Sequence, residues 1–515
     1  MTTGTGVALC LALALAAGGA RAADPGANPW FRAGQEAVKK AAAGTPTAHA
    51  KNAILFVGDG MGIATVTAAR ILAGQRAGGT GEENLLSFET LPYTAFSKTY
   101  TVDFQVGESA GTITAMMTGA KTRSGVLGVD ETVARGDFAT AATGSLPTLL
   151  ERAEDAGKWT GVVTTTTITH ATPGGCYAHT PERNWEGDAK ESPAAREAGF
   201  PDIARQLVEF KHGDGLEVAF GGGRAFFLPT AVEGGTRLDG RDLTAEWQKR
   251  FPGGPYLSTR AQLLALDPAK SRHALGLFAP SHLEFESVRA EKAPDQPSLA
   301  EMTAAAVDIL AKSPKGFVLM VEGGRIDHGH HAGNAYRALT ETIEFADAIQ
   351  LARAKTNPKD TLIVVTADHS HTLSISGYPK RGNPILGLVV GSNGEEAPSN
   401  EPAKDLSGRP YTTLQYANGP GYTGASDAQP EGAKQFPHMP TKVEGVTKGR
   451  PQLTEAEAAA PGYLQESSVP LPAETHGGED VPIYAGGPGA ALFHGVQEQN
   501  YVFHAIARAL GLETP

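Results

Sequence analysis

Five apolar runs constrain the fold of this chain more than any other sequence feature. Each ends in or beside glycine, aspartate, glutamate or histidine, and segments of helical character separate them: AILFVGDG, TGVVTTTTITH, EVAFGGG, GFVLMVEGG and TLIVVTADH. Nearly continuous apolar runs are typical of parallel strands, because helices cover both faces of a parallel sheet. We therefore predict an α/β fold with a doubly wound, mostly parallel central sheet flanked by helices.

The polar residues at the ends of these runs predict where a functional site lies. In a doubly wound sheet, ligands bind beyond the carboxyl ends of the strands. The residues there are Asp59, His170, Glu322, Asp368 and His369. We expect these side chains to meet at one end of the sheet.

Composition divides the 515 residues into five parts. Residues 23–50 form a small N-terminal arm with a short amphipathic helix, whose Trp30 and Phe31 need a packing partner, such as a second subunit. Residues 51–375 and 471–515 are predicted to form the first and last parts of the α/β core. Between them, residues 376–470 are rich in Gly, Pro, Asn and Ser, which indicates a loop-rich insertion subdomain.

The first part, residues 1–22, is predicted to be a secretory signal. It has an apolar run from Val7 to Ala17 followed by Ala20-Arg21-Ala22, a typical cleavage pattern; the alternative is a buried N-terminal helix. We expect an exported protein, periplasmic or extracellular, with no membrane anchor, because no later run approaches the length of a membrane span. Cleavage would remove Cys10 and leave Cys176 as the one cysteine, so no internal disulfide is expected.

The charge pattern argues against nucleic acid as a partner. The formal net charge is −12, and no run of Lys or Arg could follow a phosphate backbone. A small phosphorylated substrate remains compatible with this charge, because bound divalent cations would reverse the local field.

The stretch VEGGRIDHGHH, residues 321–331, holds more metal-binding side chains than one tetrahedral zinc site can use. If a helix starts there, Asp327 and His331 share one face, His328 lies beside it and His330 points away. Glu322, before the turn, could reach a different ion. The alternative is a solvated polar turn, but this density of ligand types is rare by chance.

Other short motifs add candidate residues, each with a structural alternative. Asp59 lies in the glycine-rich turn VGDGMG, Asp368 and His369 lie in VTADHSH, and His476 in ETHGGED could complete a zinc site with Asp327 and His331. Turns or ordinary hydrogen bonding could equally explain each of these residues taken alone.

Two further motifs fit the binding of a phosphate group. Ser109 begins a small-residue helical segment in GESAGTITAMMTGAKT, where a helix N-terminus could present its oxygen to an anion; the alternative is an N-cap. The stretch THATPGGCYAHTPERNW offers His170, Thr172 for a hard cation and Arg183 for phosphate oxygens. Cys176 in the same stretch is expected to be a small buried hydrophobe.

Together these motifs resemble the alkaline phosphatase family over nearly the whole mature chain, with details such as HATPGGCYAHTPERNW and HGVQEQ closer to the animal-type branch. The resemblance implies a crown-like insertion and two Zn²⁺ plus one third ion, usually Mg²⁺. It assigns the first zinc to Asp327, His331 and His476, the second zinc to Asp59, Asp368 and His369, and the third ion to Asp59, Thr172 and Glu322. His170 and His328 would lie in the outer shells of these sites.

The resemblance also implies hydrolysis of small phosphate monoesters by a homodimer. Ser109 would attack phosphorus and form a phosphoserine while Arg183 clamps two phosphate oxygens. Two departures from the family stand out. Glu108 occupies the position of an Asp that orients the arginine, so its extra methylene is expected to shift Arg183 or alter phosphate affinity. Ala279 and Gln296 stand where animal members have calcium-binding carboxylates, so that calcium site is expected to be absent.

Two other functions remain open at this point. One is a phosphodiesterase or sulfatase of the same metal-hydrolase superfamily, although Arg183, Thr172 and Glu322 favour monoesters. The other is a non-enzymatic exported protein that binds phosphate or zinc, which rests on Glu108 alone.

Overall fold

A computed structural model describes residues 24–43, 48–391, 399–405, 408–422 and 452–513 of the chain. The predicted signal at 1–22 lies outside the described residues, as does the part of the predicted insertion from 423 to 451. The helices are α1 (Pro29–Ala42), α2 (Ile63–Arg76), α3 (Ser109–Thr118), α4 (Phe138–Gly144), α5 (Leu149–Asp155), α6 (Ala171–Gly174), α7 (Pro193–Glu197), α8 (Ile203–Val208), α9 (Leu243–Arg250), α10 (Arg260–Leu264), α11 (Glu286–Lys292), α12 (Leu299–Leu310), α13 (Arg325–His331), α14 (Ala335–Lys355), α15 (Glu455–Ala458) and α16 (Tyr501–Leu510).

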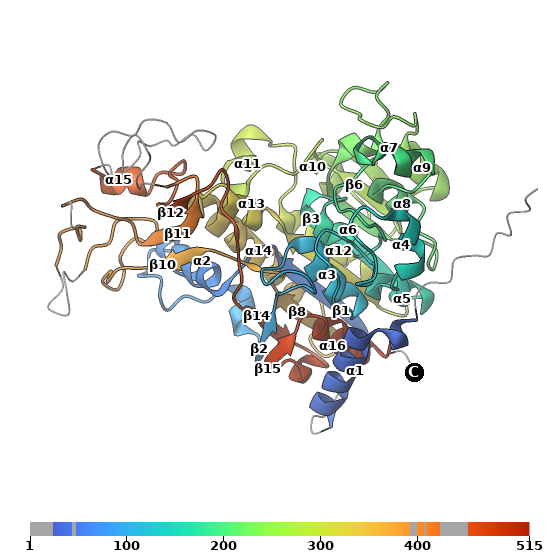
Figure 1. The fold of residues 1–515 in the computed structure, drawn as a ribbon, viewed down its shortest axis with the longest axis horizontal. Helices are drawn as coiled ribbons and strands as arrows, with labels where there is room; N and C mark the ends of the chain where they lie inside the picture. Colours follow the sequence, from blue (N-terminus) through green and yellow to red (C-terminus); the bar gives the residue numbers. More distant parts are fainter. Residues whose placement is uncertain (1–23, 44–47, 392–398, 406–407, 423–451, 514–515) are drawn as a thin grey trace, which may run out of the picture.

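A ten-stranded sheet runs through the centre of the molecule in the order β15-β2-β14-β8-β1-β7-β3-β4-β6-β5 (Figure 1). Its strands are β1 (Asn52–Gly58), β2 (Tyr93–Lys98), β3 (Trp159–Thr167), β4 (Val218–Gly222), β5 (Tyr256–Leu257), β6 (Ala274–Leu277), β7 (Phe317–Gly323), β8 (Thr361–Thr366), β14 (Val481–Gly486) and β15 (Gly495–Glu498). Among the described strands of this sheet, only β14 pairs antiparallel with its neighbours β2 and β8. The predicted α/β class and mostly parallel sheet are therefore confirmed.

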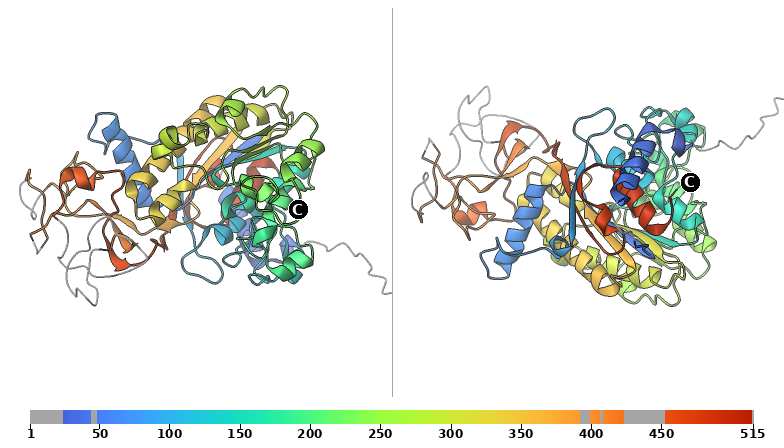
Figure 2. Two further views of the ribbon diagram at one scale, coloured as in Figure 1. Left: turned by 90° about the horizontal axis from the view of Figure 1, so that it is seen from above. Right: turned by 90° about the horizontal axis from the view of Figure 1, so that it is seen from below.

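Side chains from alternate positions of each strand pack against different helical layers. In β1, Leu55 and Val57 join the core that includes α3, α5 and α16, while Ile54 and Phe56 join the core that includes α2, α12 and α14. The views in Figure 2 show these two layers on opposite sides of the sheet. Because both faces are covered, the central strands are apolar throughout, as parallel strands require.

A smaller unit occupies one end of the molecule, away from the central sheet (Figure 1). It contains α15 and a three-stranded sheet of β10 (Leu373–Ile375), β11 (Leu414–Gly419) and β12 (Ser467–Pro470). The chain enters and leaves this unit through a two-stranded sheet of β9 (Ser370–His371) and β13 (His476–Gly477). The strand β10 begins at Leu373, slightly before the predicted start of the insertion at residue 376.

The N-terminal arm finds its packing partner within the same chain. Phe31 on α1 packs against Phe503 and His504 of α16, with ring centroids 5.8 Å and 4.6 Å away. Trp30 Nε1 donates a hydrogen bond to Glu131 at 3.0 Å. The packing need of these two aromatic residues is thus met without a second subunit.

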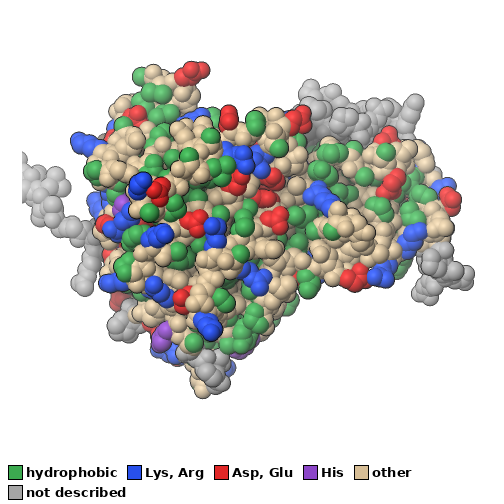
Figure 3. All heavy atoms as spheres, turned by 180° about the vertical axis from the view of Figure 1, so that it is seen from behind, with side chains coloured by type: hydrophobic (Ala, Val, Ile, Leu, Met, Phe, Trp, Pro, Cys, Tyr) green, Lys and Arg blue, Asp and Glu red, His purple; other side chains and the backbone are tan. Residues whose placement is uncertain are grey.

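The helices and the surface charges of the described residues bear on the sequence predictions about membranes and nucleic acid. No helix within the described ranges combines the length and the apolar character needed to cross a membrane. On the face in Figure 3, basic and acidic side chains are interspersed.

Candidate metal centre and active site

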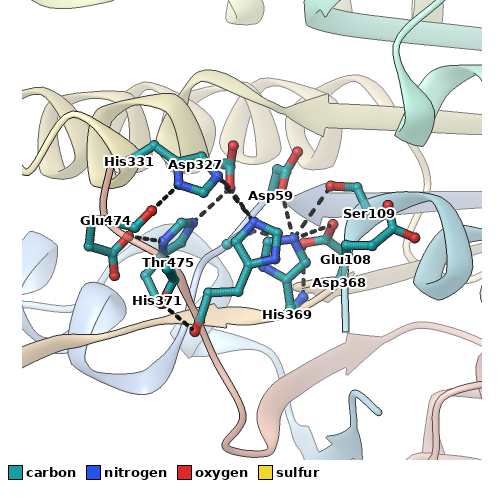
Figure 4. Close-up of polar contacts among 12 residues, drawn as sticks. Asp59, Glu108, Ser109, Asp327, His331, Asp368, His369, His371, Glu474 and Thr475 are labelled. Atoms are coloured by element: carbon teal, nitrogen blue, oxygen red, sulfur yellow. Dashed lines mark hydrogen bonds and ion pairs between the residues drawn. The ribbon is translucent and has the colours of Figure 1, made fainter. Parts of the chain in front are cut away.

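The polar residues predicted at the strand ends meet at one end of the central sheet. The strands β7 and β8 flank β1 on either side, so their carboxyl ends lie together. Asp59 directly follows β1, Glu322 is the last residue but one of β7, and Asp368 lies two residues after the end of β8. Figure 4 shows Asp59 between a group around Asp327 and a group around Ser109.

The first group of metal-binding side chains consists of Asp327, His331, His371 and His476, whose ligand atoms lie within 4.8 Å of one another. The helix α13 begins at Arg325 and places Asp327 and His331 on one face, as predicted, with His331 Nε2 3.3 Å from Asp327 Oδ1. His476 Nε2 lies 3.4 Å from the same Asp327 oxygen and 3.1 Å from His331 Nε2.

Two further groups share Asp59. One combines it with Asp368 and His369, and the other with His170 and Glu322. His369 Nε2 lies 3.4 Å from Asp59 Oδ1 and 3.3 Å from Asp368 Oδ2. Asp59 joins these two groups to each other, because a shared carboxylate can bridge two cations. The His369 ring stacks on His476 of the first group, with centroids 3.6 Å apart, so all three groups form one centre.

Buried oxygens in this centre lack the partners that burial demands. Within the described part of the chain, the following have no hydrogen-bond partner of normal geometry: both carboxylate oxygens of Asp59, Thr172 Oγ1, Glu322 Oε1 and Asp368 Oδ2. Buried polar atoms are costly unless they are paired or coordinate a cation. The donor set, oxygens with imidazole nitrogens, suits divalent metals such as zinc and magnesium. The residues therefore fit the metals that the sequence predicts.

Burial and mutual repulsion govern the titration of these carboxyl groups. Burial raises the pKa of Asp59 well above its usual range, and the neighbouring Asp368 raises it further. Burial also raises the pKa of Glu322 to about 7, although Thr164 and Thr166 donate hydrogen bonds to it. Asp327 behaves differently: burial opposes ionisation, but the neighbouring imidazoles, with His331 foremost, hold its pKa well below the usual range. Bound cations would keep all of these groups ionised.

Ser109 is the first residue of the helix α3, and Glu108 is the N-cap residue of that helix. The N-cap alternative for Ser109 is therefore wrong, and its side chain is free for another role. Ser109 Oγ lies 3.4 Å from His369 Nε2, so the hydroxyl faces the second metal-binding group. The position at a helix N-terminus also favours an anion beside it.

Glu108 serves the helix and Arg183 at once. Its Oε1 accepts hydrogen bonds from the amides of Gly111 and Gly125, at 2.7 Å and 2.8 Å. Its Oε2 accepts from the amide of Ala110 at 3.0 Å and from Arg183 Nη1 at 2.5 Å. The guanidinium opposes the effect of burial and holds the pKa of Glu108 below its usual value. Glu108 thus reaches the arginine despite its extra methylene.

His170 belongs to one of the three groups, His328 lies next to it with ring centroids 5.7 Å apart, and a third histidine joins them. Arg183 Nη2 lies 3.2 Å from His170 Nε2, and Arg325 Nη1 lies 2.9 Å from His328 Nδ1. His282 contacts both, with ring centroids 5.6 Å from His170 and 4.5 Å from His328. Burial, foremost, lowers the pKa of His282 to about 4. Sequence reasoning missed His282 because its segment, SHLEF, follows no predicted strand end with other ligand types.

His371 is the second residue that sequence reasoning missed. Its Nε2 lies 2.7 Å from Asp327 Oδ1, and its Nδ1 lies 2.5 Å from Glu474 Oε2. The available signal was VTADHSH itself, because side chains two residues apart on an extended segment share a face, and His371 is two residues after His369.

The structural interpretations of two residues are supported by their contacts. His330 is buried, with Nε2 3.0 Å from Thr65 Oγ1 and Nδ1 2.7 Å from the hydroxyl of Tyr416. Cys176 is buried in the core beside Thr172 O. Where the calcium site was expected to be absent, Ala279 is buried and Gln296 Oε1 accepts from the amide of Glu284; that absence stays a prediction.

One more acidic group, Asp214, Glu217 and His273, lies away from this centre. A guanidinium pairs with both of its carboxylates: Arg272 Nη2 lies 2.6 Å from Asp214 Oδ2 and 3.1 Å from Glu217 Oε1. These contacts make the group an ion-pair cluster.

A centre with several metal-binding groups beside a serine and a half-buried arginine is typical of a metal-dependent hydrolase. The sequence pattern of the alkaline phosphatase family matches residues 50–512. The chain belongs to the alkaline phosphatase family.

Individual relatives agree with this assignment. The tissue-nonspecific alkaline phosphatase of Gallus gallus is 44% identical over 473 residues, which cover 89% of this chain and 84% of the relative. The corresponding isozyme of Rattus norvegicus is 43% identical over 495 residues, 93% of this chain and 88% of the relative. The crystal structure of Thermus thermophilus alkaline phosphatase has a TM-score of 0.62 at 26% identity and covers 91% of this chain and 92% of that one. The predicted family and the greater similarity to its animal-type branch are thus confirmed.

Proposed function

We propose that this alkaline phosphatase family member hydrolyses small phosphate monoesters through a phosphoserine on Ser109. The observation that carries the proposal is the position of Ser109 Oγ, 3.4 Å from His369 Nε2 in one metal-binding group. Arg183, held by Glu108, is the cation available to bind two oxygens of the phosphoryl group.

The metal assignments follow the family resemblance and the donor sets. Two zinc ions would be held by Asp327, His331 and His476 and by Asp59, Asp368 and His369, and a magnesium ion by Asp59, Thr172 and Glu322. When bound, the zinc ions would supply Lewis-acid stabilisation for the attacking and leaving oxygens of an in-line displacement. The protein's own task is to present the Ser109 hydroxyl, bind the equatorial oxygens through Arg183 and release the alcohol.

The hydrogen bond between Arg183 and His170 supports an outer-shell role for this histidine. A guanidinium can only donate, so His170 Nε2 is unprotonated and Nδ1 of the neutral ring carries the proton. That Nδ1 is buried and has no partner among the described residues. A protonated nitrogen cannot bind a metal directly, but it can donate to a water or oxygen ligand of the third ion. The oxygen ligands that remain favour magnesium.

Metal analysis of the purified protein and turnover of p-nitrophenyl phosphate test this proposal. We expect two zinc ions per chain, loss of activity on chelation and its return with zinc and magnesium. Ser109→Ala should lower kcat by about a thousandfold or more, as expected for loss of a nucleophile. Faster turnover of bis-p-nitrophenyl phosphate than of the monoester would contradict the choice of substrate and favour a phosphodiesterase.

We also propose that the protein is exported after cleavage of residues 1–22, carries no membrane anchor and acts as a homodimer, with residues 376–470 as a crown-like insertion. The apolar run and the A-x-A pattern support export, and family membership supports the dimer. The N-terminal sequence of the mature protein and its mass by light scattering test these points. A mature chain that begins at Met1, or a monomer, would contradict them.

A further inference from the structure

Glu474 lies where the chain returns from the smaller unit to the central sheet. It precedes the metal-binding residue His476 by two positions, and it is 1% exposed. The return strand β13 pairs with the departing strand β9, and His476 lies directly opposite His371. A buried carboxylate therefore lies beside both ends of the segment that runs from β9 to β13, which we call the excursion.

The main chain of Glu474 holds one ligand of the first metal-binding group. Its amide donates to His331 O at 2.9 Å, and its carbonyl oxygen lies 2.5 Å from His331 Nδ1. Since a carbonyl only accepts, His331 Nδ1 carries a proton, which leaves Nε2 as the nitrogen available to a metal.

The carboxylate of Glu474 holds a second ligand through one intervening ring. Its Oε1 accepts from Thr372 N at 2.7 Å and from Thr372 Oγ1 at 2.6 Å. Its Oε2 lies 2.5 Å from His371 Nδ1, and His371 Nε2 lies 2.7 Å from Asp327 Oδ1. Glu474 thus fixes the ring of His371, and that ring fixes the carboxylate of Asp327 (Figure 4).

The second metal-binding group takes its hydrogen bonds from different residues, while its His369 ring stacks on that of His476 with centroids 3.6 Å apart. Asp368 Oδ1 accepts from the amide of Gly60 at 3.0 Å, and Gln499 Nε2 donates to Asp368 O at 2.6 Å. His369 Nδ1 lies 3.3 Å from Ser370 O. No hydrogen bond within the described part of the chain joins Glu474 to Asp59, Asp368 or His369.

We propose that Glu474 is a positioning residue for the first ion alone, the one assigned to Asp327, His331 and His476. The inference rests on the metal assignments of the proposed function. Outer partners of metal ligands fix ring and carboxylate orientation, and their loss typically weakens metal affinity by about 10- to 100-fold. Glu474 also accepts hydrogen bonds from Thr372, at the point where the chain enters the smaller unit. The orientation of these ligands therefore depends on the contact between the segment that enters the unit and the segment that leaves it.

Four variants separate positioning from simple closure. Glu474→Ala removes every side-chain contact. Glu474→Gln keeps the geometry: its oxygen can accept from Thr372 N, and its amide can donate to His371 Nδ1 while His371 Nε2 donates to Asp327. Thr372→Val removes only the hydroxyl bond to Glu474. Glu401→Ala makes the same change at an exposed residue of the smaller unit.

Cadmium binding followed by ¹¹³Cd resonance gives a readout independent of activity, because the two zinc positions differ in their number of imidazole ligands. We expect Glu474→Ala to weaken binding at the imidazole-rich position by about 10- to 100-fold and leave the other within about threefold. Cadmium affinity at both positions should be retained in Glu474→Gln, Thr372→Val and Glu401→Ala. If Glu474→Ala does not fold, Glu474→Asp takes its place, since a shorter carboxylate cannot reach both Thr372 and His371.

The inference would be overturned if Glu474→Ala weakened cadmium binding equally at both positions or left it unchanged. It would also be overturned if Thr372→Val lost as much cadmium affinity as Glu474→Ala. Wild-type protein that fails to bind two cadmium ions would instead overturn the metal assignments of the proposed function, which distinguishes the two failures.

Discussion

At the residue scale, the neighbours His330 and His331 should separate stability from metal binding. His330 is buried against Thr65 and Tyr416, so His330→Ala should lower the free energy of unfolding by about 1–3 kcal/mol through loss of buried hydrogen bonds and packing. Its zinc content and kcat should stay near those of wild type. His331→Ala should lose one zinc and nearly all activity. Metal analysis with chemical denaturation measures both, and zinc loss in His330→Ala would contradict the assignment.

Glu108 gives a second prediction at this scale. Glu108→Ala should cost about 1 kcal/mol through loss of the N-cap of α3. It also frees Arg183, so inorganic phosphate should inhibit the variant about 10-fold less strongly, as expected for a lost, partly buried hydrogen bond between charged groups. Glu131→Ala, which removes a carboxylate that contacts Trp30 rather than Arg183, is the control. Unchanged phosphate inhibition would show that Arg183 needs no support from Glu108.

Sequence reasoning succeeded at single residues where local geometry decides the outcome. The spacing of Asp327 and His331 sufficed because both lie on one helix, α13. It failed for His282, which reaches its partners only because a loop crosses the end of β3, where His282 Nδ1 accepts from the amide of Thr167. No short-range pattern encodes such a crossing.

At the element scale, the apolar runs predicted the strands because a strand covered on both faces must be apolar throughout. The direction of β14 was not predictable in this way. Its sequence, VPIYAG, resembles a parallel strand, but it follows the excursion from β9 to β13 rather than a crossover helix. The connection, not the residues of the strand, makes it antiparallel to β8.

The packing of α1 on α16 gives a prediction for these elements. A Cβ at Gly34 would overlap the buried ring of His504, so Gly34→Ala must displace that ring or push the two helices apart. We expect a loss of about 1–3 kcal/mol in the free energy of unfolding, as for other overpacked contacts. Gly462→Ala is a matched control, because its Cβ would meet nothing within 4 Å. Equal unfolding midpoints for the two variants in thermal scans would contradict close packing of the arm.

At the scale of the whole molecule, the metal centre draws on segments spread from Asp59 to His476. The order of the family's motifs along the sequence predicted this set. The physical reason for metal binding is seen only in the fold, where buried oxygens without hydrogen-bond partners lie at one place. Their cost makes the stability of the entire chain depend on bound cations, since metal binding is linked to folding.

This dependence has a predictable sign with pH. Burial raises the pKa of Glu322 to about 7 and raises the pKa values of Asp59 and Asp368. Without metal, these three groups therefore hold protons more tightly in the folded state than in the unfolded chain. The stability from these groups is fully present below their unfolded pKa values and is lost as pH rises through about 7. For Glu322 alone the change is on the order of 3 kcal/mol.

Cations take the place of these protons, so the metal-loaded protein should lack this decline. The gap in unfolding temperature between loaded and chelated protein should widen from about pH 5 to about pH 8. Zinc binding should also release protons in this range, measurable by calorimetry in buffers of different ionisation enthalpy. Burial lowers the pKa values of His331 and His369, which reduces the share of the released protons that comes from these two imidazoles. A constant gap across this pH range would mean that the carboxyl groups of Asp59, Glu322 and Asp368 are ionised even without metal.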